Sequence, residues 1–389
     1  MNAPIADSAV TRRHPPLDSA AFDALLGRLT SEFAAGAAHY DRTAEFPHAN
    51  LARLHEFDLL SLTVPASLGG AGASLPQALK VVRAVARGEP STALVLVMQY
   101  LFHHRLQGNP HWPVELRERV AREAVRDGAL INSLRVEPEL GTPARGGLPS
   151  TIAKRSADGW IIDGSKLYST GSPGLTWLAV WARSDETPPC VGVWLVHRDT
   201  PGVRVGSEWN HLGMRATGSH ELVFGNVFVP AAHAVDVHPP GEPGAGLDAP
   251  GFAWMSVLLS AVYDGVARAA RDWFAQWAAE RTPGNLGAPL ASLPAFQQTL
   301  GRIDALLFSN RVLLDASAHA ERVTLDEAPL VKYTVTNQAI EASGNPGLSR
   351  DNALERHYRD VLCARIHTPQ NDSVLQGAGR AGFAAFVRA

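Results

Sequence analysis

Histidines are the side chains with the most evident chemistry near neutral pH, because imidazole has an unperturbed pKa near 6.5. The chain has fifteen of them, and His103 and His104 stand side by side in the apolar segment MQYLFHHRL. Neighbouring residues on a helix point about 100° apart, so only one of the pair can face a given site. The histidines show no HExxH or paired-ligand spacing, and we therefore expect no metal site.

Other sequence patterns are compatible with a phosphate contact and exclude some classes of function. The glycine-rich ASGNPGLSRDN at 342–352 has a backbone that can approach a phosphate or ribose closely. Cys190 and Cys363 are too few for a disulfide framework or a zinc cluster. No G-x-S-x-G elbow of a serine hydrolase is present.

The bulk composition excludes several classes of partner. A formal charge of −3, with 19% charged residues, gives no electrostatic footprint for nucleic acid or an anionic membrane. No apolar run approaches the roughly 18 residues of a membrane span, and the N-terminus lacks the apolar region of a secretory signal. We expect a cytoplasmic protein with a small-molecule substrate.

The elements that must position these residues fall into three parts. Over 160–230, short runs rich in Val, Trp, Leu and Ile alternate with turn residues, which predicts an antiparallel β-domain. The flanks have helical spacing, as in the stripe of Phe22, Leu25, Leu26 and Leu29. Ser74 is positioned to cap a helix that ends at Gly88, and later helices are expected at 252–281, 293–320, 330–342 and 352–366.

These patterns predict a domain order along the 389 residues. A loose tail at 1–18 is followed by an N-terminal helical domain at 19–128 and a β-domain at 129–237. A Pro/Gly-rich linker at 238–251 precedes a C-terminal helical bundle at 252–389.

Six segments, in this order, resemble the acyl-CoA dehydrogenase superfamily: FDLLSLTVPASLGGAGASL, ARGEPSTALVL, VEPELGTPARG, GWIIDGSKLYSTGSPG, the strand at 212–230 and RHYRDV. The resemblance implies an α+β multidomain fold with an N-terminal helical domain, a central antiparallel β-domain and a C-terminal four-helix bundle. It also implies a flavin held between these parts and a homotetramer or homodimer.

The same resemblance suggests which residues bind the flavin. Val136 stands where the family usually has a hydroxyl residue, and Thr142 keeps a hydroxyl further along VEPELGT. In KLYSTG, Tyr168 corresponds to the aromatic residue that covers one flavin face. Thr170 corresponds to the Thr or Ser near the flavin N5 nitrogen, with Ser169 between them.

Contacts to the flavin phosphates are also implied by resemblance. Arg281 and Thr282 match the family's ERxxFG segment, whose Arg reaches the pyrophosphate of the neighbouring subunit's flavin. A guanidinium suits such bidentate contact. Pro283 and Asn285 depart from that segment, and Gly344 lies in the place of the family's GGxG turn.

The resemblance also implies a catalytic Glu, which is missing here both from its usual place and from the place where a few relatives have it. Nine residues after Arg359 the chain has Thr368, and the alternative position falls at Met255 or Ser256. A threonine hydroxyl is a very poor base, so ordinary dehydrogenation of an acyl thioester is not supported. The carboxylates next in sequence are Asp264 and Asp372.

The segment ARIHT resembles instead the flavin-dependent monooxygenase branch of the superfamily, which includes dibenzothiophene- and sulfone-type monooxygenases. That branch takes reduced FMN from a separate flavin reductase and has a His at or beside the base position. A second His comes from the N-terminal domain. The matching residues are His367 with Thr368, and His103 or His104. Imidazole can donate a hydrogen bond or a proton without holding a fixed negative charge.

We therefore expect a flavin-dependent oxidoreductase, and favour a reduced-flavin-dependent monooxygenase of a small organic substrate. One alternative is an acyl-CoA dehydrogenase with FAD and a relocated base. The other is a flavin-free binding protein or a lyase on the same fold. The sequence leaves FAD or FMN open, because the motifs for the adenosine half match least well.

Overall fold

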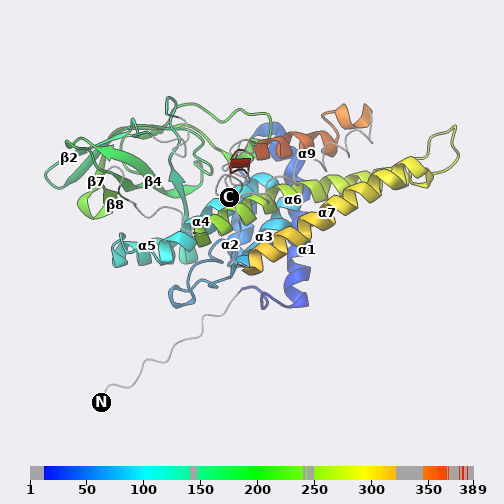
Figure 1. The fold of residues 1–389 in the computed structure, drawn as a ribbon, viewed down its shortest axis with the longest axis horizontal. Helices are drawn as coiled ribbons and strands as arrows, with labels where there is room; N and C mark the ends of the chain where they lie inside the picture. Colours follow the sequence, from blue (N-terminus) through cyan, green and yellow to red (C-terminus); the bar gives the residue numbers. More distant parts are fainter. Residues whose placement is uncertain are drawn as a thin grey trace, which may run out of the picture.

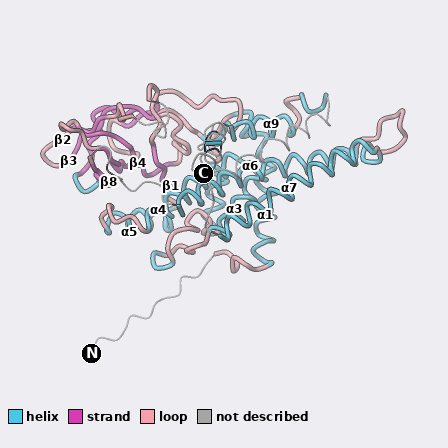
Figure 2. Tube along the Cα trace, in the orientation of Figure 1, coloured by secondary structure: helices cyan, strands magenta, loops and turns pink. Residues whose placement is uncertain are grey.

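The computed structural model describes residues 13–140, 147–239, 242, 249–320, 345–365, 367, 376, 379–380 and 383. Helices precede and follow a sheet (Figures 1 and 2). The first group is α1 (Ala20–Thr43), α2 (His48–Glu56), α3 (Leu75–Gly88), α4 (Pro90–Gln107) and α5 (Val114–Asp127). The second group is α6 (Ala249–Glu280), α7 (Pro294–Ala320) and α9 (Ala353–Leu362). The expected order of helical, β and helical parts is confirmed, while the helix expected at 330–342 lies outside the described residues.

The sheet has eight strands: β1 (Leu130–Leu134), β2 (Ile152–Arg155), β3 (Gly159–Lys166), β4 (Leu175–Ser184), β5 (Val191–His197), β6 (Val203–Val205), β7 (Leu222–Pro230) and β8 (Ala234–His238). Their order is β6-β7-β3-β2-β4-β5-β8, with β1 also on β4. The sheet is mixed and not purely antiparallel, because β1 and β2 both run parallel to β4. The expectation of a purely antiparallel β-domain is therefore wrong. Alternating apolar runs and turn residues predict that strands form, but strand direction depends on how distant segments are connected.

The first helices form as the sequence predicts. Phe22, Leu25, Leu26 and Leu29 of α1 are all buried. Ser74 and Gln77 form a capping box at the start of α3. Gly88 ends α3 but does not form a left-handed cap. A Cβ atom there would lie 2.6 Å from the carbonyl oxygen of Thr30, so glycine lets α1 pack closely.

The long helix α6 connects the parts of the molecule. It packs against α3, α4, α7 and α9, and its central residues Val257–Val262 are almost all buried. Together α6 and α7 form a hairpin whose tip points away from the sheet (Figure 1). None of the helices in the described ranges is long and apolar enough to cross a membrane.

Candidate active site

The loop after β3 presents an aromatic side chain on strained backbone. Tyr168 has φ +53°, in the left-handed region that aromatic residues rarely adopt. Its side chain is 50% exposed, and its ring meets the edges of Trp209 and His211, with both pairs of ring centroids 6.0 Å apart. Trp209 and His211 are themselves stacked at 3.5 Å. A half-exposed ring held in this way is available to pack against a planar ligand.

Two residues further along the chain, the hydroxyl of Thr170 belongs to a short network of hydrogen bonds. Thr170 Oγ1 lies 2.9 Å from Ser219 Oγ, which lies 2.8 Å from Thr217 Oγ1. Thr217 Oγ1 donates to the carbonyl oxygen of Met214 at 3.0 Å. Asn132 on β1 holds the backbone of Thr170 by donating to its carbonyl oxygen at 3.0 Å. The Thr170 hydroxyl is therefore fixed in orientation.

A buried ion pair lies where β3 ends and the same loop begins. Lys166 Nζ lies 2.5 Å from Glu137 Oε1, and both side chains are inaccessible to solvent. Burial lowers the pKa of Lys166 to about 8, although Glu137 opposes that change. Burial alone would raise the pKa of Glu137, but hydrogen bonds from Lys166 and Thr151 outweigh it and the pKa falls. The pair fixes the backbone of Val136, whose carbonyl accepts from Leu167 N at 2.9 Å.

The β-domain is joined to α9 next to this network. Met214 N donates to Asp360 Oδ1 at 2.7 Å. A Cβ atom on Gly213 would lie 2.3 Å from the carbonyl oxygen of Arg359, so the backbone at Gly213 packs directly on α9. Burial raises the pKa of Asp360 to about 7 despite the hydrogen bond from Met214. Asp360 is therefore a buried carboxyl group that titrates near neutral pH.

Beyond Asp360, α6 contributes a tyrosine that meets one of the expected histidines. The Tyr263 hydroxyl is hydrogen-bonded to Nδ1 of His367, and the two ring centroids are 5.7 Å apart. Tyr263 is fully buried, and burial, followed by the charges of Cys363 and Asp360, raises its pKa well above its usual range. The hydroxyl therefore stays protonated, and the structure brings His367 to the face of α6 next to α9.

The two adjacent histidines of α4 lie in different surroundings. His104 stacks on Trp254 of α6, with ring centroids 4.0 Å apart and planes 15° from parallel. His103 is buried, with Nε2 3.1 Å from Gln99 Nε2, and it lines a separate pocket beside Leu106 and Arg117. Burial lowers the pKa of His103 to about 4. His103 is therefore neutral near pH 7, and His104 is the one of the pair that contacts α6.

The histidines His104 and His367 meet α6 at separate points. Trp254 and Tyr263 are nine residues apart, which is about 13 Å along an ideal helix and half a turn around it. Sequence reasoning expected the two imidazoles to share one site. The described contacts place them on opposite faces of α6.

Several other expected residues have defined places. Ser169 is buried and donates to the carbonyl oxygen of Lys166 at 3.2 Å, so its hydroxyl points inward. Arg281 and Thr282 are exposed where α6 ends. Arg281 lies 27 residues beyond Trp254, which is about 40 Å along an ideal helix. Thr142, Gly344 and Thr368 lie outside the described residues.

Of the carboxylates proposed as relocated bases, the structure describes only Asp264, which is held in ion pairs. Asp264 is fully buried and accepts from Arg268 Nε at 2.8 Å, with Arg83 Nε 3.3 Å away. Such a carboxylate is already neutralised by its ion pairs. Asp372 lies outside the described residues. Met255 is partly buried and Ser256 is buried, and neither is acidic.

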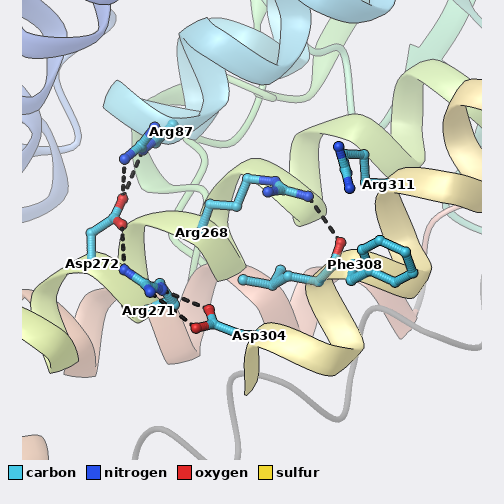
Figure 3. A pocket seen from close by; sticks show the side chains of 8 residues that line it. Arg87, Arg268, Arg271, Asp272, Asp304, Phe308 and Arg311 are labelled. Carbon is cyan, nitrogen blue, oxygen red and sulfur yellow. Dashed lines mark hydrogen bonds and ion pairs between the residues drawn. The ribbon is translucent and has the colours of Figure 1, made fainter. Parts of the chain in front are cut away.

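A pocket of about 320 Å³ lies elsewhere, between α3, α6 and α7 (Figure 3). Arg271 binds Asp304 through two hydrogen bonds of 2.8 and 3.0 Å. Arg87 Nε donates to Asp272 at 2.8 Å, and Arg268 donates to the carbonyl oxygen of Leu307. These guanidinium groups already have partners within the chain. We therefore do not assign the active site to this pocket.

Sequence reasoning missed several residues that the structure brings to the site: Asn132, Trp254, Tyr263, Thr217, Ser219 and Asp360. The sequence did contain signals for some of them. Asn132 is a polar residue inside an apolar strand, and Asp360 belongs to the quoted RHYRDV segment. Tyr263 had no such signal, because one aromatic residue in an apolar helix is typical of a core.

Comparisons with known proteins match this architecture over most of the chain. Models described as the N-terminal, middle and C-terminal domains of acyl-CoA dehydrogenase match residues 22–107, 136–227 and 257–371. The acyl-CoA dehydrogenase-like protein YdbM of Bacillus subtilis (strain 168) is 33% identical, over 90% of this chain and 93% of its own. The chain belongs to the acyl-CoA dehydrogenase family. An L-evernosamine nitrososynthase of Micromonospora sp. is 29% identical, over 92% of this chain and 89% of its own.

Solved structures of the same fold contain FMN. KijD3, in complex with FMN and an amino-keto sugar nucleotide, has 26% identity and a TM-score of 0.74, and the match covers 96% of each chain. TdsC from Paenibacillus sp. A11-2, with FMN and indole, has a TM-score of 0.81 at 20% identity, over 92% of this chain and 95% of its own. The likeness to TdsC concerns the fold. The residues of this chain fit a flavin ring, since Tyr168 offers a half-exposed aromatic face beside the oriented Thr170 hydroxyl.

Proposed function

We propose that this family member is a reduced-flavin-dependent monooxygenase that oxygenates a small organic substrate. One observation carries the proposal. The buried Tyr263 hydroxyl of α6 is hydrogen-bonded to the imidazole of His367, which follows α9 in the chain. Dehydrogenation of a thioester would instead require a free carboxylate, and Asp264 is engaged in ion pairs.

The relatives support oxygen chemistry on this fold. A nitrososynthase forms a nitroso group, which is an oxidised amine, and this relative aligns with 92% of the chain. KijD3 holds FMN together with an amino sugar nucleotide. We therefore propose FMN as the flavin and a small molecule with an oxidisable nitrogen or sulfur as the substrate. A separate flavin reductase would supply the reduced cofactor.

The residues have distinct roles in this proposal. Bound reduced flavin would supply the electrons that activate oxygen. Tyr168 would cover the ring, and Thr170 would contact its edge. We propose that the Tyr263 hydroxyl donates to Nδ1 of His367, which would leave the ring hydrogen on Nε2 to be donated toward the reacting oxygen. The His104–Trp254 stack contacts α6 at a separate point and would affect the rate only by positioning that helix.

Oligomer formation completes the proposed phosphate contacts. Arg281 is exposed where α6 ends, and the hairpin of α6 and α7 points away from the sheet (Figure 1). A second copy can bring Arg281 to the flavin phosphate of its neighbour, where a guanidinium binds bidentately. We therefore propose a homo-oligomer in which each site uses two chains.

An acyl-CoA dehydrogenase is the second candidate, and a specific observation favours it. YdbM shares 33% identity, and Asp360 is a buried carboxyl group with a pKa of about 7, suited to a general base. However, Asp360 is buried and already accepts a hydrogen bond from Met214 N. We therefore assign it a structural role.

One experiment separates these functions. The purified protein would be loaded with FMN or FAD and then mixed anaerobically with a panel of acyl-CoA thioesters. In a second arm, protein with reduced FMN would meet isotopically labelled oxygen and a panel of amines and thioethers. We expect label in an oxygenated product and no flavin bleaching by thioesters. Bleaching by a thioester would instead establish the dehydrogenase, and absence of flavin binding in both redox states would reject both activities.

A further inference from the structure

The hydroxyl network behind Thr170 has a single direction. It contains three oxygen–oxygen contacts in series: Thr170 to Ser219 at 2.9 Å, Ser219 to Thr217 at 2.8 Å, and Thr217 to the Met214 carbonyl at 3.0 Å. Each contact needs one hydrogen, because two bare oxygens at that distance repel each other. Three hydroxyl groups supply three hydrogens, and the carbonyl supplies none.

All three contacts can be satisfied in only one way. Thr217 must donate to Met214, Ser219 to Thr217, and Thr170 to Ser219. Trp209 Nε1 also donates to the Met214 carbonyl at 2.9 Å, but a carbonyl can only accept and so cannot reverse the order. Thr217 and Ser219 are 0% and 5% exposed, which leaves bulk water little room to supply a substitute hydrogen.

The hydrogen of Thr170 is thus directed inward, and only its lone pairs face the candidate site. We infer that Thr170 acts as an obligate hydrogen-bond acceptor, so that the site selects reduced over oxidised flavin. In a reduced flavin N5 carries a hydrogen and can donate to Thr170. In an oxidised flavin N5 is itself an acceptor and would face a second acceptor. The inference rests on the proposed function, in which Thr170 contacts the N5 edge.

The expected magnitude follows from the cost of an unmatched hydrogen-bonding group, about 1–3 kcal/mol. We expect reduced FMN to bind roughly 5- to 150-fold more tightly than oxidised FMN. For a two-electron couple, a tenfold ratio raises the midpoint potential of the bound flavin by about 30 mV relative to free FMN. This preference would favour loading by a reductase and retention of the cofactor until oxygen arrives.

The experiment compares the dissociation constants of oxidised FMN and chemically reduced FMN under anaerobic conditions, together with the midpoint potential of the bound flavin. Ser219→Ala removes the acceptor for the Thr170 hydrogen and frees Thr170 to donate. We expect this variant to gain affinity for oxidised FMN and to lose most of the preference. Thr170→Val should lose the preference as well, whereas Thr170→Ser should retain it.

Ser172→Ala is the matched control. Ser172 is buried in the same loop and donates to the Gly218 carbonyl at 2.7 Å, outside the chain of hydroxyls. It should lose similar stability with no change in the ratio of dissociation constants. Equal wild-type affinity for both redox states, or an unchanged ratio in a folded Ser219→Ala variant, would overturn the inference and leave flavin binding intact. No binding of FMN in either state would reject the proposed function and this inference with it.

Discussion

The two sides of the candidate site are held by different interactions. On the β-domain side, Lys166 and Glu137 form a buried ion pair. Thr170 is the first member of a series of three hydrogen bonds that ends at the Met214 carbonyl. On the helical side, His104 stacks on Trp254 and His367 is hydrogen-bonded to Tyr263, at separate points of α6. A network of hydrogen bonds fixes its members in one geometry, whereas ring stacking is less directional. We infer that the β-domain side positions the flavin and the helical side carries the chemistry.

Lys166→Met should have the largest effect, because it leaves the Glu137 charge buried without its partner. We expect the free energy of unfolding to fall by about 3–5 kcal/mol, measured by urea denaturation. Lys154→Met is the control. Lys154 is exposed and lies 3.5 Å from Asp163 in the same sheet, and such surface pairs contribute about 0–1 kcal/mol. Equal losses in the two variants would contradict a stabilising role for the buried pair.

Tyr263→Phe and His367→Ala test the helical side. We expect each to lower the rate of substrate oxygenation by about 10²-fold or more, because a positioned proton donor is lost. The dissociation constant of reduced FMN should change little. Tyr100→Phe is the matched control, since Tyr100 is equally buried and donates to the Leu59 carbonyl at 2.6 Å, outside the contact between Tyr263 and His367. Oxygenation at the wild-type rate in His367→Ala would exclude that residue from the chemistry.

Asp360→Asn tests the junction between the two sides. Its folded pKa of about 7 exceeds the ordinary value of 3.8, so the wild type loses stability as pH rises from about 4 to 7. Asparagine keeps an acceptor for Met214 N and carries no charge. We expect the variant to be more stable than wild type at pH 8, by up to about 4 kcal/mol, with no gain near pH 4.

Thermal and urea unfolding between pH 4 and 8 would measure this difference. Asp264→Asn serves as the opposite control, because its carboxylate is paired with Arg268 and its loss should destabilise the protein at neutral pH. A gain for Asp360→Asn that did not grow with pH would contradict the assignment.

The smallest effect should distinguish the two adjacent histidines. His104→Phe keeps a ring against Trp254 but removes the imidazole, and we expect oxygenation to slow by up to about tenfold. His103→Phe should leave the rate unchanged and lower stability instead, because it removes the contact with Gln99 in the core. Steady-state rates and unfolding curves of both variants would check this, and the reverse pattern would exchange their roles.

Particular residues show how far sequence reasoning reached. The α1 stripe beginning at Phe22 and the Ser74 cap were predictable because helix periodicity and capping are local properties. The parallel pairing of β1 and β2 with β4 was not predictable, because it depends on how distant segments connect. The direction of the Thr170 hydrogen required coordinates for Ser219 and Thr217, which lie nearly fifty residues away.

The sequence by itself determined the family, the order of helical and β parts, and the loss of acidic residues at the usual base positions, since these follow from local residue types and their order. Only the tertiary structure decided that His104 contacts α6, that His367 pairs with Tyr263, and that Asp264 is held in ion pairs. The physical reason is that hydrogen bonding, burial and ring stacking depend on three-dimensional neighbours. Those neighbours come from segments that the linear order keeps far apart.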